Sequence, residues 1–77
     1  MQNILLGDIM AQGNLPIGFI MSIAQNQEAM KNFSNLDDTN RNKITNYIQA
    51  SATGDDALER INISINNLEK NDLNFLN

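Results

Sequence analysis

Apolar residues recur along this chain with the spacing of a helix, in segments separated by short polar stretches. In the first segment, residues 15–25, hydrophobic side chains projected at 100° per residue cover an arc of roughly 240°. Only a narrow strip with Gly18 and Ser22 interrupts this arc, and these two small residues would let another helix approach closely. A helix that is apolar on nearly every side belongs inside a bundle. We therefore expect residues 15–25 at the centre of the fold.

The next segment, residues 27–35, has a second apolar stripe formed by Ala29, Met30 and Phe33. Asn26 stands between the two segments and can either restart a helix or kink a continuous one. One bent helix and two separate helices both fit this sequence.

Residues that cap helix N-termini precede the predicted helices. Asn14 stands before Leu15-Pro16, where a first-turn proline forfeits no hydrogen bond. Asp37 or Asp38 can cap a third helix, and Thr53 begins the T-x-x-D form of a capping box with Asp in place of the usual Glu. The predicted helices cover about residues 15–25, 27–35, 38–52 and 54–70.

Two patterns conflict in the last predicted helix. Residues 60–66 alternate strictly between polar and apolar, which is typical of a strand. In a helix begun by Thr53, however, one arc of about 100° contains five apolar residues, and no partner strand is evident; they are Ala57, Leu58, Ile61, Ile65 and Leu68. We therefore predict a helix with Ile61 and Ile65 buried. Ile63 then falls on the opposite, polar face, either as an isolated exposed residue or as a contact point for a partner.

The predicted fold class is all-α, a compact bundle of about four helices in one domain over residues 15–70. Residues 1–14 form an N-terminal arm with a short apolar cluster, either a helical turn laid on the core or a loose segment. Residues 71–77 form a C-terminal tail whose apolar side chains either fold back on the core or fray; these are Leu73, Phe75 and Leu76.

The amino-acid composition excludes several kinds of reactive site and binding partner. The 77 residues include no Cys and no His, so disulfides, thiol nucleophiles, imidazole bases and the commonest metal ligands are all excluded. The net charge is −4 and the five basic residues are spread along the chain, without the basic cluster that nucleic-acid binding needs. We find no membrane-spanning stretch and no signal peptide, and therefore expect a cytoplasmic protein.

No motif predicts a catalytic, cofactor-binding or metal site. The segment that begins at Asp38 resembles the start of a calcium loop, but its sixth position is Lys43 and no acid follows before Asp55. A helix-turn-helix could be built from residues 27–35 and 38–52, with Asn40 and Arg41 as base-reading residue types. Acidic residues at the start of its recognition helix argue against that function.

The spacing LPxGFxMxxAxNxxAMxxFxxL over residues 15–36 resembles a pattern in small, uncharacterised helical proteins of Firmicutes. A more local likeness links Arg41-x-x-Ile44-x-x-Tyr47-Ile48 and Ala57-x-x-Arg60-Ile61 to the C-terminal helical segment of YdeI/OmpD-associated, bacteriocin-protection-type proteins. Both resemblances imply a helical fold. Neither implies an activity or a site residue for this chain.

We expect a non-enzymatic protein without cofactors that contacts a protein partner or a second copy of itself. The reason is its surplus of apolar residues, 42% of the chain, beside its lack of reactive side chains. The candidate interface residues are Ile63, Leu73, Phe75 and Leu76. A nucleic-acid-binding regulator and a small-ligand binder are the alternatives.

Overall fold

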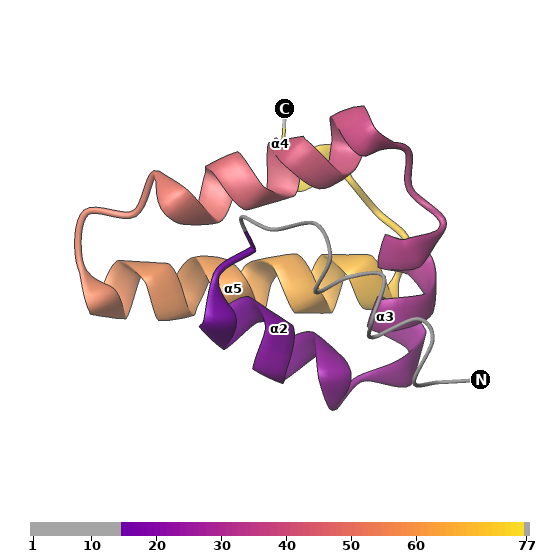
Figure 1. Cartoon of the computed structure of the whole chain (residues 1–77), viewed down its shortest axis with the longest axis horizontal. Coiled ribbons are helices and arrows are strands. Elements are labelled where there is room, and N and C mark those ends of the chain that lie inside the picture. The colour runs from indigo at the N-terminus through magenta and orange to yellow at the C-terminus, as the bar shows by residue number, and fades with distance from the viewer. Residues whose placement is uncertain (1–14, 77) are drawn as a thin grey trace.

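A computed structural model describes residues 15–76 of the chain (Figure 1). Its elements are the helices α2 (Ile17–Ala24), α3 (Gln27–Ser34), α4 (Asp38–Gln49) and α5 (Gly54–Glu69), and the 3-10 turn η1 (Asn74–Leu76). The all-α prediction is confirmed, and residues 60–66 are helical despite their alternating pattern. The predicted N-terminal arm lies outside the described residues. Helix α2 begins at Ile17 with Pro16 as its N-cap and no side-chain capping bond, so the predicted start at residue 15 behind a cap at Asn14 is wrong.

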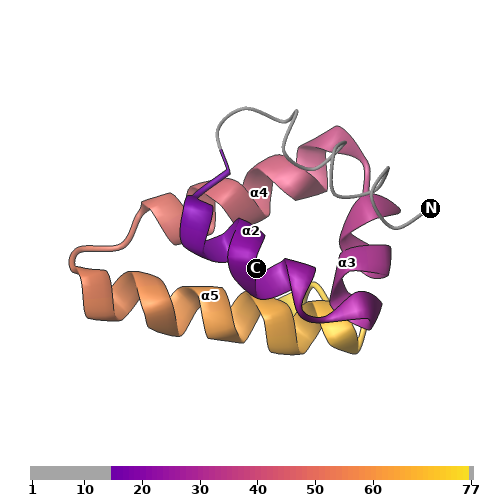
Figure 2. The same ribbon diagram turned by 60° about the horizontal axis from the view of Figure 1, so that its bottom comes forward.

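Helix α5 is the element on which the others assemble: Figure 1 shows it between α4 and α2, and the turned view of Figure 2 shows it along one side of the bundle. Helices α2, α3 and α4 and the turn η1 each pack against it. The expectation that residues 15–25 lie at the centre is wrong, because α2 buries only Phe19 and Ile23 and leaves Ile17 and Met21 exposed. A helix of eight residues is about 12 Å long, and α2 packs mainly against α5 and α3, so one side of it has no neighbour within the described fold.

The first two apolar segments form two separate helices. Asn26 adopts an extended backbone and its side chain accepts a hydrogen bond from the Ala29 amide at 3.0 Å, which caps α3. The two helices still share a core, since the rings of Phe19 and Phe33 meet edge to face with 5.3 Å between centroids.

The capping signals of the last two long helices are confirmed. Asp37, the first of the two candidate caps, accepts from the amide of Asn40 at 3.0 Å. Thr53 accepts from the amide of Asp56 at 3.0 Å. Helix α4 ends at Gln49, about three residues earlier than predicted, where the hydroxyl and the amide of Ser51 both donate to the Ile48 carbonyl and turn the chain.

Helix α5 ends in a Schellman motif. Asn71 has a φ of 56°, its amide donates to the Leu68 carbonyl, and the amide of Asp72 donates to the Asn67 carbonyl. The side-chain amide of Asn32, on α3, also donates to the Leu68 carbonyl at 2.7 Å. The C-terminal end of α5 is thereby joined to α3.

The core consists of one cluster of buried apolar side chains drawn from all four helices. Its members are Phe19, Ile23, Ala29, Met30, Phe33, Ile44, Ile48, Ile61, Ile65 and Leu68. Two buried hydroxyl groups, those of Thr45 and Ser64, donate to the carbonyl one turn earlier and so have hydrogen-bond partners.

The C-terminal tail folds back on the bundle. Leu73, Phe75 and Leu76 are partly buried against the core, and the rings of Tyr47 and Phe75 meet edge to face at 5.4 Å. Of the two alternatives for the tail, docking on the core is therefore the one observed.

The different burial of two isoleucines on α5 predicts that shortening them to Ala will destabilise the protein to different extents. Replacing Ile61, which is buried in the core, with Ala should lower the free energy of unfolding by about 2–5 kcal/mol through lost burial and a cavity. Ile63 is half-buried and lies outside the core cluster, so Ile63→Ala should cost much less. Urea denaturation of both variants measures the difference, and equal large losses would contradict this packing.

The left-handed backbone at Asn71 predicts that substitution by Ala and by Gly will change the stability in opposite directions. Asn71→Ala should destabilise by about 1 kcal/mol, whereas Asn71→Gly should be neutral or stabilising, because only glycine adopts a positive φ without steric cost. Thermal unfolding at fixed pH measures both. A stability for Asn71→Ala at or above that of Asn71→Gly would disprove the role assigned to this position.

Candidate protein-docking groove

An open groove lies where the start of α2, the end of α4 and the start of α5 meet. It encloses about 660 Å³ and is lined mostly by apolar groups, including Ile17, Ile48, Ala57, Leu58 and Ile61. Ile17 and Leu58 are 70% and 57% exposed, and they belong to the three large hydrophobic residues that are open to solvent among residues 15–76. We name this surface the α2–α5 groove.

The third exposed residue extends this surface along α2. Met21 is 61% exposed and lies four residues after Ile17, on the same face of the helix. No residue from Ile17 to Ala24 is charged. The exposed side of α2 is therefore an uncharged apolar strip beside the groove.

Close contact between α2 and α5 forms the floor of the groove. A Cβ atom at Gly18 would lie 3.2 Å from Cδ1 of Ile61, so the two helices meet here at the distance that glycine permits. The predicted close approach of another helix at Gly18 is thus confirmed. Leu58 precedes Ile61 by one turn and is exposed, although it belongs to the same apolar arc of α5 as the buried Ile61.

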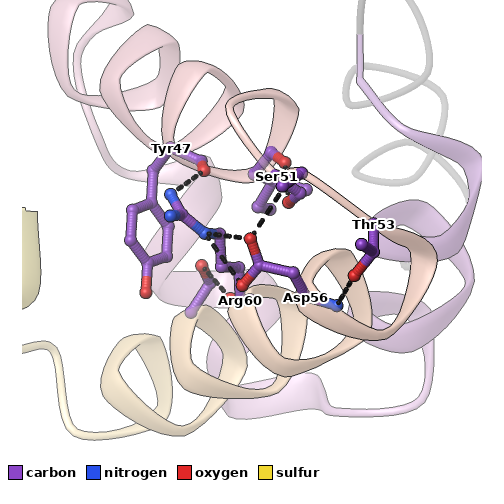
Figure 3. Close-up of polar contacts among 8 residues, drawn as sticks. Tyr47, Ser51, Thr53, Asp56 and Arg60 are labelled. Carbon is purple, nitrogen blue, oxygen red and sulfur yellow. Dashed lines mark hydrogen bonds and ion pairs between the residues drawn. The ribbon is translucent and has the colours of Figure 1, made fainter.

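The turn between α4 and α5 lines one side of the groove, and polar contacts hold this turn in place (Figure 3). Asp56 accepts from the Ala52 amide at 3.1 Å, one residue before the capping Thr53. Arg60 donates to the Tyr47 carbonyl at 2.8 Å, lies over the Tyr47 ring at 4.9 Å and pairs with Asp56 at 3.4 Å. Arg60 thus satisfies a carbonyl in the last turn of α4 from a position on α5.

The lining of the groove contains no charged side chain. Asp55 and Glu59 lie on α5 on either side of Leu58 in the sequence, both are exposed, and neither pairs with a basic side chain of the described residues. The groove lining contains no Lys or Arg. Asp55 is three residues before Leu58 and is therefore its neighbour on the helix surface, whereas Glu59 lies on the side of α5 that faces away from Ala57 and Ile61.

A second cavity, beside Arg41, is small. It holds about 90 Å³ between α3 and α4 and is lined partly by Asn42, Thr45 and Asn46. Sites for small ligands usually enclose about 300–1,000 Å³. This cavity is therefore too small for such a ligand.

Helices α3 and α4 do not form a compact helix-turn-helix unit. Both pack mainly on α5 rather than on one another. Arg41, a base-reading residue type, instead donates to the carbonyls of Ser34 and Leu36 and pairs with Asp38. Its guanidinium therefore holds the turn between the two helices.

The four interface candidates from the sequence do not lie in the α2–α5 groove. Ile63 is half-buried on α5, and the other three pack against the core from the tail; these are Leu73, Phe75 and Leu76. Sequence reasoning missed the exposure of Ile17, Met21 and Leu58 because it assigned them to buried stripes. The apolar arc of about 240° in the first helix was a signal of this exposure, because an eight-residue helix that packs against two neighbours cannot bury every side.

Residues 15–76 contain neither a metal-ligand cluster nor a membrane-spanning helix. No three His, Cys, Asp or Glu side chains in this range come together as metal ligands would. None of the helices in the same range is long and apolar enough to cross a membrane.

The bridging role of Arg60 predicts a loss of stability on its replacement. Arg60→Met keeps the aliphatic stem but leaves the Tyr47 carbonyl without this donor, so the free energy of unfolding should fall by about 1–2 kcal/mol. Lys43→Met, at an exposed position on α4, serves as the control and should stay within about 0.5 kcal/mol of the parent. Denaturant titration of the two variants measures their free energies of unfolding, and equal values for Arg60→Met and Lys43→Met would contradict the bridging role.

Comparison of the chain with protein-family models, curated proteins and solved structures gave no match. The two resemblances drawn from the sequence therefore stay predictions.

Proposed function

We propose that this chain is a small non-enzymatic protein-interaction module that binds its partner through the α2–α5 groove. The observation that supports the proposal is the grouping of exposed apolar side chains there. Ile17 and Leu58 line one groove, and Met21 continues it along α2. Such a grouping on a soluble domain is typical of a docking surface.

The lining of the groove favours a protein partner over a small ligand. Small-ligand sites are concave, bury most of the ligand and have a few converging polar groups. The α2–α5 groove is instead wide open to solvent. The hydroxyl groups of Ser51 and Thr53 in its lining bond to nearby backbone groups and stabilise the α4–α5 turn.

A cytoplasmic location belongs to the same proposal. Disulfides are rare in the reducing cytoplasm, and a chain without Cys needs none for its stability. Nucleic acid is the less favoured partner class, since Arg41 is engaged at the α3–α4 turn and the lining of the groove contains no Lys or Arg.

Site-specific photo-crosslinking in living cells tests the proposed function. A photoreactive residue at position 17, 21 or 58 should give discrete adducts with a protein, because positions 17 and 58 are exposed in the groove lining and position 21 is exposed beside it. The same residue at position 43 or 66, exposed positions outside the groove lining, should give much weaker adducts. An adduct of twice the chain mass would identify a second copy as the occupant. Equal adduct patterns at all five positions, or no adduct at any, would overturn the proposal.

A further inference from the structure

The exposed apolar surface of this fold has two adjoining parts. One is the α2–α5 groove, and the other is the α2 strip, which we define as the exposed side chains of Ile17 and Met21. We propose that two copies of the chain dock about a two-fold axis, with the α2 strip of each copy in the groove of the other. This inference rests on the proposed function and names its partner.

The position of the groove at one end of α2 is the geometric argument. Of the residues of α2, only Ile17 and Gly18 line the groove, and most of the lining comes from the end of α4, the α4–α5 turn and the first half of α5. Figure 1 shows that turn beyond the start of α2. Met21 lies about 6 Å further along the axis of α2 in the other direction. The groove and Met21 therefore lie on opposite sides of Ile17 along this helix.

A two-fold axis at Ile17 makes use of this order. Such an axis, perpendicular to α2, sets the α2 helices of the two copies antiparallel and gives both copies the same contacts. It places Met21 of each copy beyond the start of α2 in the other copy, which is where the groove lies. Met21 then meets the exposed Leu58 of the second copy. Each contact between strip and groove is thus made twice.

Neither part of this surface carries a charge. No residue of α2 is charged, and the groove lining contains no charged side chain. Two chains of net charge −4 repel one another, so a face without acids is where they can approach most closely. Salt should strengthen this association, because it screens the remaining repulsion between the copies. A partner held by opposite charges would instead be weakened by salt.

The size of the surface predicts a weak dimer. The exposed side chains of Ile17, Met21 and Leu58 give each copy apolar area on the order of a few hundred Å², whereas a stable interface buries about 800 Å² on each partner. The two-fold arrangement uses the strip and the groove of both copies together. We expect a dissociation constant of roughly 10–500 µM.

Sedimentation equilibrium on the full chain tests the inference. Between about 10 µM and about 1 mM the mean mass should rise from that of one chain toward that of two. The rise should begin at a lower concentration in about 0.5 M salt than in about 0.05 M salt. In isotope-filtered NMR spectra of a mixed labelled sample, the methyl group of Met21 in one copy should show contacts with Leu58 of the other.

Charged substitutions at two exposed positions assign the contact. Met21→Glu and Leu58→Glu should each weaken dimerisation by about ten-fold or more, because each buries an unpaired charge in the interface. The matched control, Asn66→Glu, adds the same charge at an exposed position of α5 outside the groove lining and should change the dissociation constant by less than about two-fold. Circular dichroism verifies that each variant is folded.

A mixture of two variants tests the antiparallel arrangement. Met21→Lys alone should be as monomeric as Leu58→Glu alone, for the same reason. Mixed together, the two variants should form a heterodimer, because the introduced lysine of one copy meets the introduced glutamate of the other. The second half of that interface keeps its parent side chains.

The outcomes separate this inference from the proposed function. A chain that stays monomeric at the highest concentration, while its crosslinks join it to another protein, overturns the second copy but supports docking at the groove. If Asn66→Glu weakens the dimer as much as Met21→Glu does, or if the mixture gives no heterodimer, the proposed arrangement is wrong. If the chain is monomeric and the crosslinking also fails, both proposals are wrong.

Discussion

The packing of one face of α5 is the constraint on which the rest of this structure depends. Each of the other described elements packs against this helix. Its buried stripe contains Ile61, Ser64, Ile65 and Leu68, and the small side chain of Ser64 occupies a fully buried position with its hydroxyl bonded to the Arg60 carbonyl. In a domain with no disulfide this shared face joins the helices into one core.

Both ends of α5 are fixed to its neighbours, in addition to the apolar stripe. At the N-terminal end, Asp56 and Arg60 bond to the turn and to the last turn of α4. At the C-terminal end, Asn32 of α3 bonds to a terminal carbonyl of α5, next to the left-handed residue Asn71. These polar contacts satisfy backbone groups at helix ends and fix the direction of the neighbouring helices.

The α2–α5 groove follows from a mismatch in helix length. Helix α5 has 16 residues and α2 has eight, so at 1.5 Å per residue α2 covers about half of the length of α5. The first turns of α5 extend beyond that contact toward the α4–α5 turn, as Figure 1 shows. Leu58 lies at the boundary, and so it is exposed beside Ile17 although it belongs to the apolar side of its helix. On the polar side of the same turns, Asp56 and Arg60 bond to the α4–α5 turn and to α4, whereas Asp55 and Glu59 face solvent.

The amino-acid sequence alone determines the fold class, the approximate bounds of the helical segments and the N-terminal caps of α3, α4 and α5, because apolar spacing and the capping side chains of Asn26, Asp37 and Thr53 act within a few residues. It also separates Ile61 and Ile65 from Ile63, since those positions follow from helix geometry alone. That the first two segments are separate helices was left open by the sequence and is decided by the structure. Which apolar faces find a neighbour depends instead on helix lengths and crossing positions. Only the tertiary structure therefore made α5 the element on which the others assemble, exposed Ile17, Met21 and Leu58, and packed the tail onto the core.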